Sequence, residues 1–161
     1  MQRPYSRDCN FTVREVTYPG SGNNTQFSYD ALSRATKIEE RTAGSVTSTK
    51  QHIWAGSSRC EERDAFSSLS NGKLFFGMGQ ANFTSGNPNS YFYTADHLDS
   101  IREMTKTVTG TTTIESQYGY SPYGEVTKIS GSQDSDFQYA DYYKQSRAGL
   151  FITLTRPTIQ V

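Results

Sequence analysis

Residues 91–103 read YFYTADHLDSIRE, and residues 118–129 read YGYSPYGEVTKI. Segments rich in Tyr, Thr, Ile and Val alternate here with turn-forming clusters, and Ser121 to Gly124 has the composition of a type I turn. Residues 113–120 place Ile114, Ser116, Tyr118 and Tyr120 on one face, with a period of two. This pattern predicts two linked β-hairpins with an aromatic-rich face.

A shorter form of the pattern recurs earlier in the chain. Two aromatic-type residues, separated by one, are followed by Arg or Glu seven residues after the first: Phe27, Tyr29 and Arg34; His52, Trp54 and Arg59; Tyr118, Tyr120 and Glu125. Each copy has room for one hairpin, and an isolated hairpin is marginally stable, so the copies must stack into a wider sheet. The predicted fold class is therefore all-β, with consecutive antiparallel hairpins in one curved, twisted sheet.

Composition and charge restrict the class of protein. The chain has 161 residues, a length typical of one domain, and its 16 Lys and Arg balance 16 Asp and Glu. This balance provides neither the basic surface typical of nucleic-acid binding nor a polybasic membrane patch. Leu, Ile, Val and Phe total only 28, whereas Ser and Thr total 39 and Tyr 11. These counts favour strands and turns, with tyrosine rings supplying much of the buried area.

No targeting or membrane-spanning segment is predicted. Residues 1–9 are polar throughout, unlike a signal peptide, and no apolar run approaches the roughly 18 residues of a membrane helix. The sequence alone therefore predicts no localisation. Cys9 and Cys60 are the two cysteines, and we interpret them as unrelated thiols rather than a disulfide.

Strand-like and turn-like segments alternate along the rest of the chain. We expect strands at residues 11–18, 26–29, 35–39, 73–76, 137–143 and 150–155. Residues 65–90 carry many of the Ser, Asn and Gly clusters and are predicted to be a loop-rich connection. The chain is thus expected to be a single region, 1–161, with repeats at 11–64 and a second repeat block at 91–156. Residues 157–161 form a tail that diverges from this repeat pattern.

The two quoted blocks resemble the core of rearrangement-hotspot (Rhs) proteins, also called YD-repeat proteins. Residues 27–34 resemble a single YD repeat, so residues 11–64 would be YD-like repeats and residues 91–156 the RHS repeat-associated core. The residues that carry the repeat motif are Phe27, Tyr29, Asp30, Arg34, His52, Trp54, Arg59, Tyr91, Tyr93, Asp96, His97, Leu98, Tyr118, Tyr120, Pro122, Tyr123 and Gly124.

The resemblance implies a structural role. Large Rhs proteins are hollow, secreted or cell-surface shells, in which a β-sheet ribbon spirals into a cocoon around a C-terminal toxin. By resemblance, this chain is a non-catalytic shell segment whose partners are other shell segments and the enclosed toxin. The family's cleavage segment is not matched after Arg156, where the sequence reads Pro-Thr-Ile-Gln-Val. We therefore expect a truncated fragment without cleavage activity.

Three positions where the family has glycine differ in this chain, namely Ser33, Asp99 and Asp141. Glycine adopts positive φ freely, whereas Asp and Ser do so at a cost, so these turns should be weakened. An open sheet also exposes unpaired edge groups. We expect a marginally stable piece that self-associates through its sheet edges.

Motifs for metal or catalytic chemistry are incomplete. His97 lies beside Asp96 and Asp99, but a zinc site needs about three or four ligands, so we interpret His97 as a turn residue. Asp134 and Asp136 match only a fragment of a calcium loop. The sequence holds no Gly-x-Ser-x-Gly elbow and no nucleotide-binding glycine pattern. The chain is therefore predicted to be no enzyme and to bind no cofactor or metal.

The alternative function is a carbohydrate-binding or cell-surface interaction module. In that hypothesis Tyr91, Tyr93, Tyr118 and Tyr120 are exposed and stack on sugar rings. The opposite expectation, which we favour, is that these rings fill the inner face of the sheet. The exposure of the four rings separates the two hypotheses.

Overall fold

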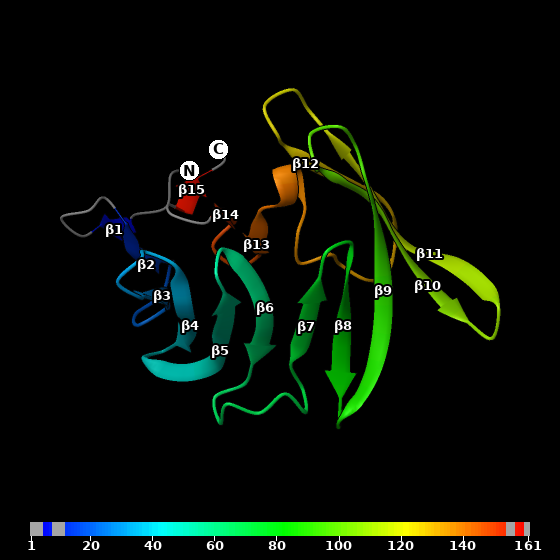
Figure 1. Cartoon of the computed structure of the whole chain (residues 1–161). Coiled ribbons are helices and arrows are strands. Elements are labelled where there is room, and N and C mark those ends of the chain that lie inside the picture. The colour runs from blue at the N-terminus through cyan, green and yellow to red at the C-terminus, as the bar shows by residue number, and fades with distance from the viewer. Residues whose placement is uncertain (1–4, 8–11, 154–156, 160–161) are drawn as a thin grey trace.

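The chain folds into short strands joined by turns (Figure 1). The structure is a computed structural model that describes residues 5–7, 12–153 and 157–159. Within these residues the only helical element is one 3-10 turn, which confirms the predicted all-β class. The elements are β1 (Tyr5–Arg7), β2 (Val13–Thr17), β3 (Asn24–Tyr29), β4 (Ala35–Thr42), β5 (Ser45–Ala55), β6 (Ser58–Arg63), β7 (Lys73–Phe76), β8 (Gly79–Thr84), β9 (Asn87–Ala95), β10 (Ile101–Val108), β11 (Thr111–Tyr120), β12 (Val126–Gly131), η1 (Tyr139–Asp141), β13 (Tyr143–Gln145), β14 (Leu150–Ile152) and β15 (Pro157–Ile159).

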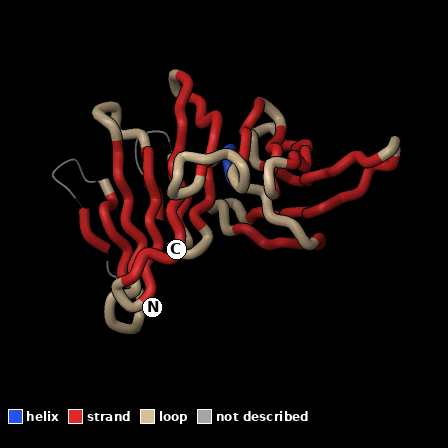
Figure 2. Tube along the Cα trace, turned by 90° about the horizontal axis from the view of Figure 1, so that it is seen from below, coloured by secondary structure: helices blue, strands red, loops and turns tan. Residues whose placement is uncertain are grey.

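Strands β1 to β12 form one open antiparallel sheet in the order in which they occur in the sequence. Each strand pairs with its sequence neighbours, as predicted from the hairpin repeat, and the sheet forms a curved layer (Figure 2). The β3–β4 pair shares six register positions. The β6–β7 pair shares only two, Glu61 with Leu74 and Glu62 with Lys73. This junction is therefore weakly held by backbone pairing alone.

Three of the two-residue hairpin turns share one backbone geometry: Ala43-Gly44, Ser85-Gly86 and Thr109-Gly110. Both residues of each turn have positive φ, with 48° to 50° at the first and 80° to 81° at the glycine. This is the type I′ geometry, which matches the right-handed twist of the flanking strands. Glycine adopts the second conformation without a steric penalty.

After β12 the chain doubles back across the concave face of the sheet. We call residues 134–152 the crossing segment; it contains η1, β13 and β14 and lies within the curve of the sheet in Figure 1. Strands β13 to β15 pair with one another as a separate three-stranded antiparallel sheet. The C-terminal strands therefore do not extend the large sheet.

Two secondary-structure predictions are wrong in detail. Residues 137–143 are not a strand, because Phe137 and Tyr143 share one isolated bridge and the chain between them turns with positive φ at Ala140 and Asp141. Their aromatic spacing reflects contacts made while crossing the sheet. Residues 65–90 are more regular than expected, since β8 and part of β9 join the predicted strand at 73–76.

Ile114 also differs from its prediction. Ser116 and Tyr118 are buried on the inner face, but Ile114 is 51% exposed. The β10–β11 hairpin extends beyond the rest of the sheet (Figure 1), so its outer half has no second layer to pack against. A register shift between Met104 and Thr105 falls at this point of the hairpin.

Two hydrophobic clusters form the core. One packs β2, β3 and β4 against the crossing segment, and the other lies between β9 and β10. Phe137 packs against both clusters, so the crossing segment joins them. The buried members are Val13, Val16, Phe27, Ala35, Ile38, Tyr143, Ala148, Leu150 and Ile152 in the first cluster, and Tyr91, Tyr93, Ile101 and Met104 in the second.

Candidate functional site

A five-residue turn recurs in four connections of the large sheet. Its first side chain accepts a hydrogen bond from the backbone N–H four residues on, at 2.9 to 3.0 Å. In the three aspartate turns the same oxygen also accepts from the N–H two residues on, at 2.9 Å. The first residues are Asp30, Asp64, Asp96 and Ser121, and the fourth residues, Ser33, Ser67, Asp99 and Gly124, all have positive φ.

This geometry explains why the motif carries an aspartate at the turn. The carboxylate satisfies two backbone donors that the chain reversal would otherwise leave unpaired. The hydrogen bond from the backbone of Arg34 lowers the pKa of Asp30. Ser33 and Asp99 do stand where the backbone favours glycine. The Asp64 turn carries no such signal in the sequence, because no aromatic pair precedes it.

In each aromatic pair of the repeat, the first and the second residue have different functions. The first member points inward, and Phe27, His52 and Tyr118 are each 3% exposed. The second member donates a hydrogen bond to the carbonyl of the first residue of the preceding strand. These bonds are Tyr29 Oη to Val13 (2.7 Å), Trp54 Nε1 to Ala35 (2.9 Å) and Tyr120 Oη to Ile101 (2.6 Å).

The two arginines of the repeat have different surroundings despite their equal spacing. Arg34 pairs with Asp30 inside its turn, at 2.6 Å. Arg59 lies within β6, where it is 7% exposed and stacks on the rings of Trp54 and Tyr143. The β5–β6 connection is shorter than the Asp30 turn, so the same sequence offset reaches a different place in the sheet.

The tyrosines of the glycan hypothesis are largely unavailable for stacking. Tyr91, Tyr93 and Tyr118 are 6%, 8% and 3% exposed. The Tyr93 hydroxyl donates to Gln80, and the Tyr118 hydroxyl accepts from the Ser135 N–H at 2.8 Å. Tyr120 is half-buried, with its hydroxyl bonded to the Ile101 carbonyl. These rings fill the inner face of the sheet, so their burial does not support a role in stacking on sugar rings.

The remaining motif residues lie in turns. His97, Leu98, Pro122 and Tyr123 are exposed, whereas Gly124 is buried. No group of three or more His, Cys, Asp or Glu side chains that could hold a metal ion occurs in the described part of the chain. Asp134 and Asp136 are instead paired with lysines, Lys128 at 3.0 Å and Lys73 at 2.6 Å. Cys60 is a free thiol, and Cys9 lies outside the described residues.

The crossing segment contacts strands from β11 to β4. These contacts hold the concave face together without adding to the backbone ladder of the large sheet. They are Ser135 N–H to Tyr118 Oη on β11 (2.8 Å), Ile101 N–H on β10 to the Gln138 carbonyl (3.0 Å), Lys73 Nζ on β7 to Asp136 (2.6 Å), Tyr143 Oη to Glu62 on β6 (2.7 Å) and Gln145 Nε2 to Glu40 on β4 (2.8 Å).

Tyr143 is the centre of a buried polar network beside the weakly paired β6–β7 junction, on its β5–β6 side. Its hydroxyl donates to Glu62 Oε2 at 2.7 Å and accepts from Lys50 Nζ at 3.2 Å. Its ring meets the His52 ring edge-on, with centroids 5.1 Å apart. Burial raises the pKa of Tyr143 well above its usual value, so the hydroxyl remains a donor. This one side chain links two strands to the crossing segment.

Charges in the network are compensated within it. Burial alone would raise the pKa of Glu62, but His52 and the charges of Lys50 and Lys73 hold it well below its usual range. Burial lowers the pKa of His52 to about 4, so its ring is neutral at pH 7. Lys73 contacts both carboxylate oxygens of Asp136 at 2.6 Å. Buried pairs of this kind are costly to break, so they hold the segment in position.

Solved structures share this fold, although no protein-family model and no curated protein matches the chain. A crystal structure of a TcdB2–TccC3 complex matches with a TM-score of 0.70 and 12% identity, over 98% of this chain and 8% of that chain. The Photorhabdus luminescens Tc holotoxin pore matches with a TM-score of 0.71 and 13% identity, over 97% and 8%. TcdB2–TccC3 without its hypervariable C-terminal region gives 0.66 and 12%, over 92% and 8%.

This likeness establishes a common fold. The chain spans about 8% of the length of the Tc toxin chains that it matches, and nearly all of this chain is included. Its consecutive hairpins therefore have the arrangement of a short stretch of those much longer chains. No helix in the described residues is long and apolar enough to cross a membrane.

The buried network is the feature that sequence reasoning misses. Tyr143 and Glu62 are 81 residues apart, and Lys73 and Asp136 are 63 apart. Local periodicity carries no signal for such pairs. The sequence holds one local sign of a buried charge: Lys73 directly precedes the apolar run that begins at Leu74.

Proposed function

We propose that the chain is a non-catalytic segment of an Rhs or YD-repeat shell. Its convex face would form part of the outer wall, and its concave face would line a space that holds another polypeptide, a toxin in the large relatives. The observation that carries the proposal is the strand order: twelve strands in sequence order, with repeated turns and, among the described residues, edge strands that pair on one side only. Such a ribbon can be lengthened at either edge without rearrangement.

The fold-level likeness to Tc toxin chains supports the same function. Those chains are more than ten times longer, and this chain matches one stretch of them over nearly its whole length. The burial of Tyr91, Tyr93 and Tyr118 supports rings that hold a wall together rather than bind sugars. We further propose that residues 11–64 are YD-like repeats and that residues 91–156 correspond to the RHS repeat-associated core.

The edges of the sheet supply the test. Strand β12 pairs on one side only, and Ile129 on this strand is 67% exposed. Unpaired edges recruit other chains, and a lysine on an edge strand opposes such pairing. In size-exclusion chromatography the chain should elute as oligomers, with a broad or low thermal transition. Ile129→Lys should shift it towards the monomer.

Val108→Lys is the matched control, because Val108 is also exposed (54%) but lies on an interior strand. This variant should remain as oligomeric as the unmodified chain. A clean monomer with a sharp transition near or above the usual mesophilic range, roughly 45–65 °C, would contradict the proposal. Equal effects of the two substitutions would show that association does not use the β12 edge.

A further inference from the structure

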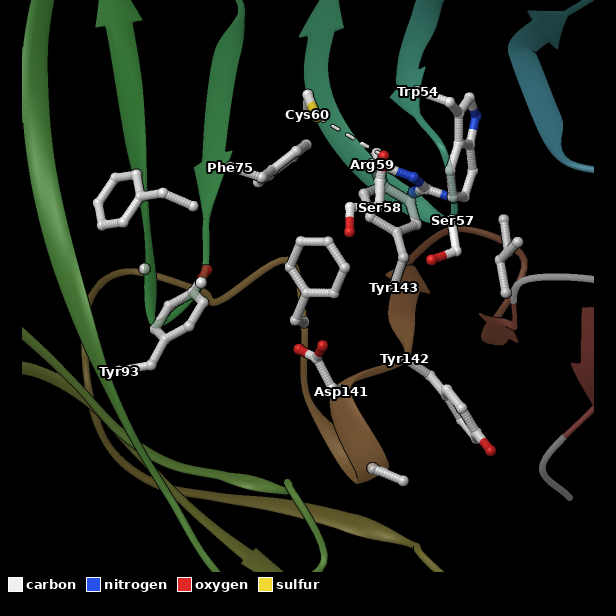
Figure 3. A pocket seen from close by; sticks show the side chains of 16 residues that line it. Trp54, Ser57, Ser58, Arg59, Cys60, Phe75, Tyr93, Asp141, Tyr142 and Tyr143 are labelled. Atoms are coloured by element: carbon white, nitrogen blue, oxygen red, sulfur yellow. Dashed lines mark hydrogen bonds between the residues drawn. The ribbon is translucent and has the colours of Figure 1, made fainter.

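A pocket of about 350 Å³ lies on the concave face between the β5–β6 turn, β7 and the crossing segment (Figure 3). None of the functions considered above uses it. Aromatic rings make up much of its wall, and two charged side chains reach it from different elements. The lining residues that matter here are Trp54, Arg59, Phe75, Phe137, Asp141 and Tyr143.

Arg59 is a buried cation that forms no ion pair among the described residues, although the more distant charges of Glu62 and Asp136 act on it. It is 7% exposed, and its guanidinium carbon stands 3.9 Å from the ring centroid of Tyr143 and 4.9 Å from that of Trp54. Its Nε and Nη1 groups are buried and have no hydrogen-bond partner among the described residues. Burial lowers the pKa of Arg59 to about 10, so it remains charged at neutral pH.

Three other arginines of the sheet have a close carboxylate partner. Arg34, Arg63 and Arg102 each form an ion pair at 2.6 to 2.7 Å. Leaving a buried cation unpaired is unfavourable, and the planar N–H fork of a guanidinium matches the two oxygens of a carboxylate. The stacking on two rings holds this fork in a fixed orientation beside the pocket.

The rest of the pocket is suited to an apolar group. The rings of Phe75 and Phe137 meet edge-on with centroids 5.1 Å apart, and both line the pocket. A small inorganic anion would leave these rings uncovered. A carboxylate carried on a flat apolar body would satisfy Arg59 and cover the rings at the same time.

We propose that this pocket binds a carboxylate carried on an apolar body, with the carboxylate received by Arg59 and the body packed against Phe75 and Phe137. The carboxylate can come from a polypeptide, as an acidic side chain or a C-terminus, or from a free organic acid. The inference stands on Arg59 and the pocket, and it does not require the shell function.

Trp54 provides a direct readout, because it is the only tryptophan of the chain and lines the pocket. Its fluorescence should change and saturate when phenylacetate is added to the 161-residue chain. Phenylacetamide has the same shape without the charge, and it should bind at least about tenfold more weakly. Equal binding of the acid and the amide would overturn the proposal.

Two variants assign the effect to Arg59. Arg59→Met keeps the length of the side chain and should weaken phenylacetate binding by at least about tenfold. Arg63→Met removes a partly exposed arginine that does not line the pocket, and it should bind as the unmodified chain does. Equal weakening in both variants would overturn the proposal. If circular dichroism shows that Arg59→Met does not fold, the acid–amide comparison on the unmodified chain decides.

A peptide pair separates the two sources of the carboxylate. Acetyl-Gly-Phe with a free C-terminus and its C-terminal amide are titrated in the same way. Tighter binding of the peptide acid than of phenylacetate supports a polypeptide source, and weaker binding supports a free acid. Binding of the peptide amide as tight as that of the peptide acid would contradict a carboxylate site.

Asp141 gives an independent check from the opposite wall. Figure 3 shows its carboxyl group pointing into the pocket. Burial raises the pKa of Asp141 to about 6, so at pH 7 and above this group carries a negative charge that opposes an anionic ligand. Asp141→Asn should therefore tighten phenylacetate binding by roughly threefold and leave phenylacetamide binding unchanged. Weaker acid binding in this variant would contradict the assigned orientation.

Discussion

Replacing Tyr143 with phenylalanine tests how the crossing segment is held on the sheet. The substitution removes one hydroxyl oxygen and keeps the ring, which is 1% exposed and packs against His52 and Phe75. Glu62 then loses a hydrogen bond of 2.7 Å, and Lys50 loses an acceptor at 3.2 Å. The β6–β7 junction, which has only two register positions, loses part of its support.

The magnitude follows from the type of bond. A hydrogen bond to a charged, buried group contributes about 1.5–3 kcal/mol. Glu62 retains Lys50 at 3.4 Å, so the carboxylate is not left alone. We therefore expect the free energy of unfolding to fall by about 2 kcal/mol. For a chain of this length, that corresponds to a melting temperature lower by about 4–8 °C.

Urea denaturation gives the change in stability, and hydrogen exchange gives its location. Exchange should accelerate most in peptides from β6 and β7, because the crossing segment supports their weak pairing. Tyr142→Phe is the matched control: the residue is 36% exposed and has no hydroxyl hydrogen bond among the described residues. It should change stability by less than about 0.5 kcal/mol.

Two outcomes would refute this reasoning. Equal effects of Tyr143→Phe and Tyr142→Phe would show that the Glu62 hydrogen bond contributes nothing. A loss of protection spread evenly over β2 to β12 would show that the crossing segment does not act at the β6–β7 junction.

Three further substitutions test separate parts of the structure. The pKa of His52 is about 4 in the folded chain and 6.5 in its ordinary state. Between these pH values the unfolded chain binds one more proton than the folded chain, so stability rises with pH by up to about 3 kcal/mol. His52→Phe should flatten this dependence of stability on pH in urea titrations, and an unchanged dependence would contradict the prediction. Lys73→Met leaves the buried carboxylate of Asp136 unpaired and should lower the free energy of unfolding, measured by urea denaturation, by about 3 kcal/mol. Adding Asp136→Leu in the same chain should restore most of this loss, and no recovery would argue against the ion pair. Asp99→Gly relieves the backbone strain of a φ of 59° and should stabilise the fold by about 0.5 kcal/mol, which raises the melting temperature by about a degree or two. A lower melting temperature would show that the aspartate has another function.

The ribbon architecture follows from local sequence signals. Alternation in residues 113–120 and the turn residues from Ser121 to Gly124 identify one hairpin, and the recurrence of the aromatic pair extends it into a sheet. Glycine positions taken by Ser33 and Asp99 can be located in the same way, because each follows a turn aspartate at a fixed distance.

Other features depend on the folded chain as a whole. Arg34 and Arg59 follow their aromatic pairs at the same offset, yet only one enters a turn, because the lengths of the two connections differ. The path of residues 134–152 across the concave face depends on contacts with strands far away in the sequence, such as Asp136 with Lys73. Period and composition hold no information about such a return path, so residues 137–143 resemble a strand in sequence and form a turn in the structure.

The most direct test of the shell function is electron cryomicroscopy of the native polypeptide that carries this segment, purified from its source. We expect β1 and β12 both to be paired with further strands of a longer ribbon, and the face that carries Tyr93, Tyr118 and the crossing segment to point towards an enclosed polypeptide. A free-standing molecule with both edge strands exposed to solvent, and nothing within the curve of the sheet except the crossing segment, would contradict it.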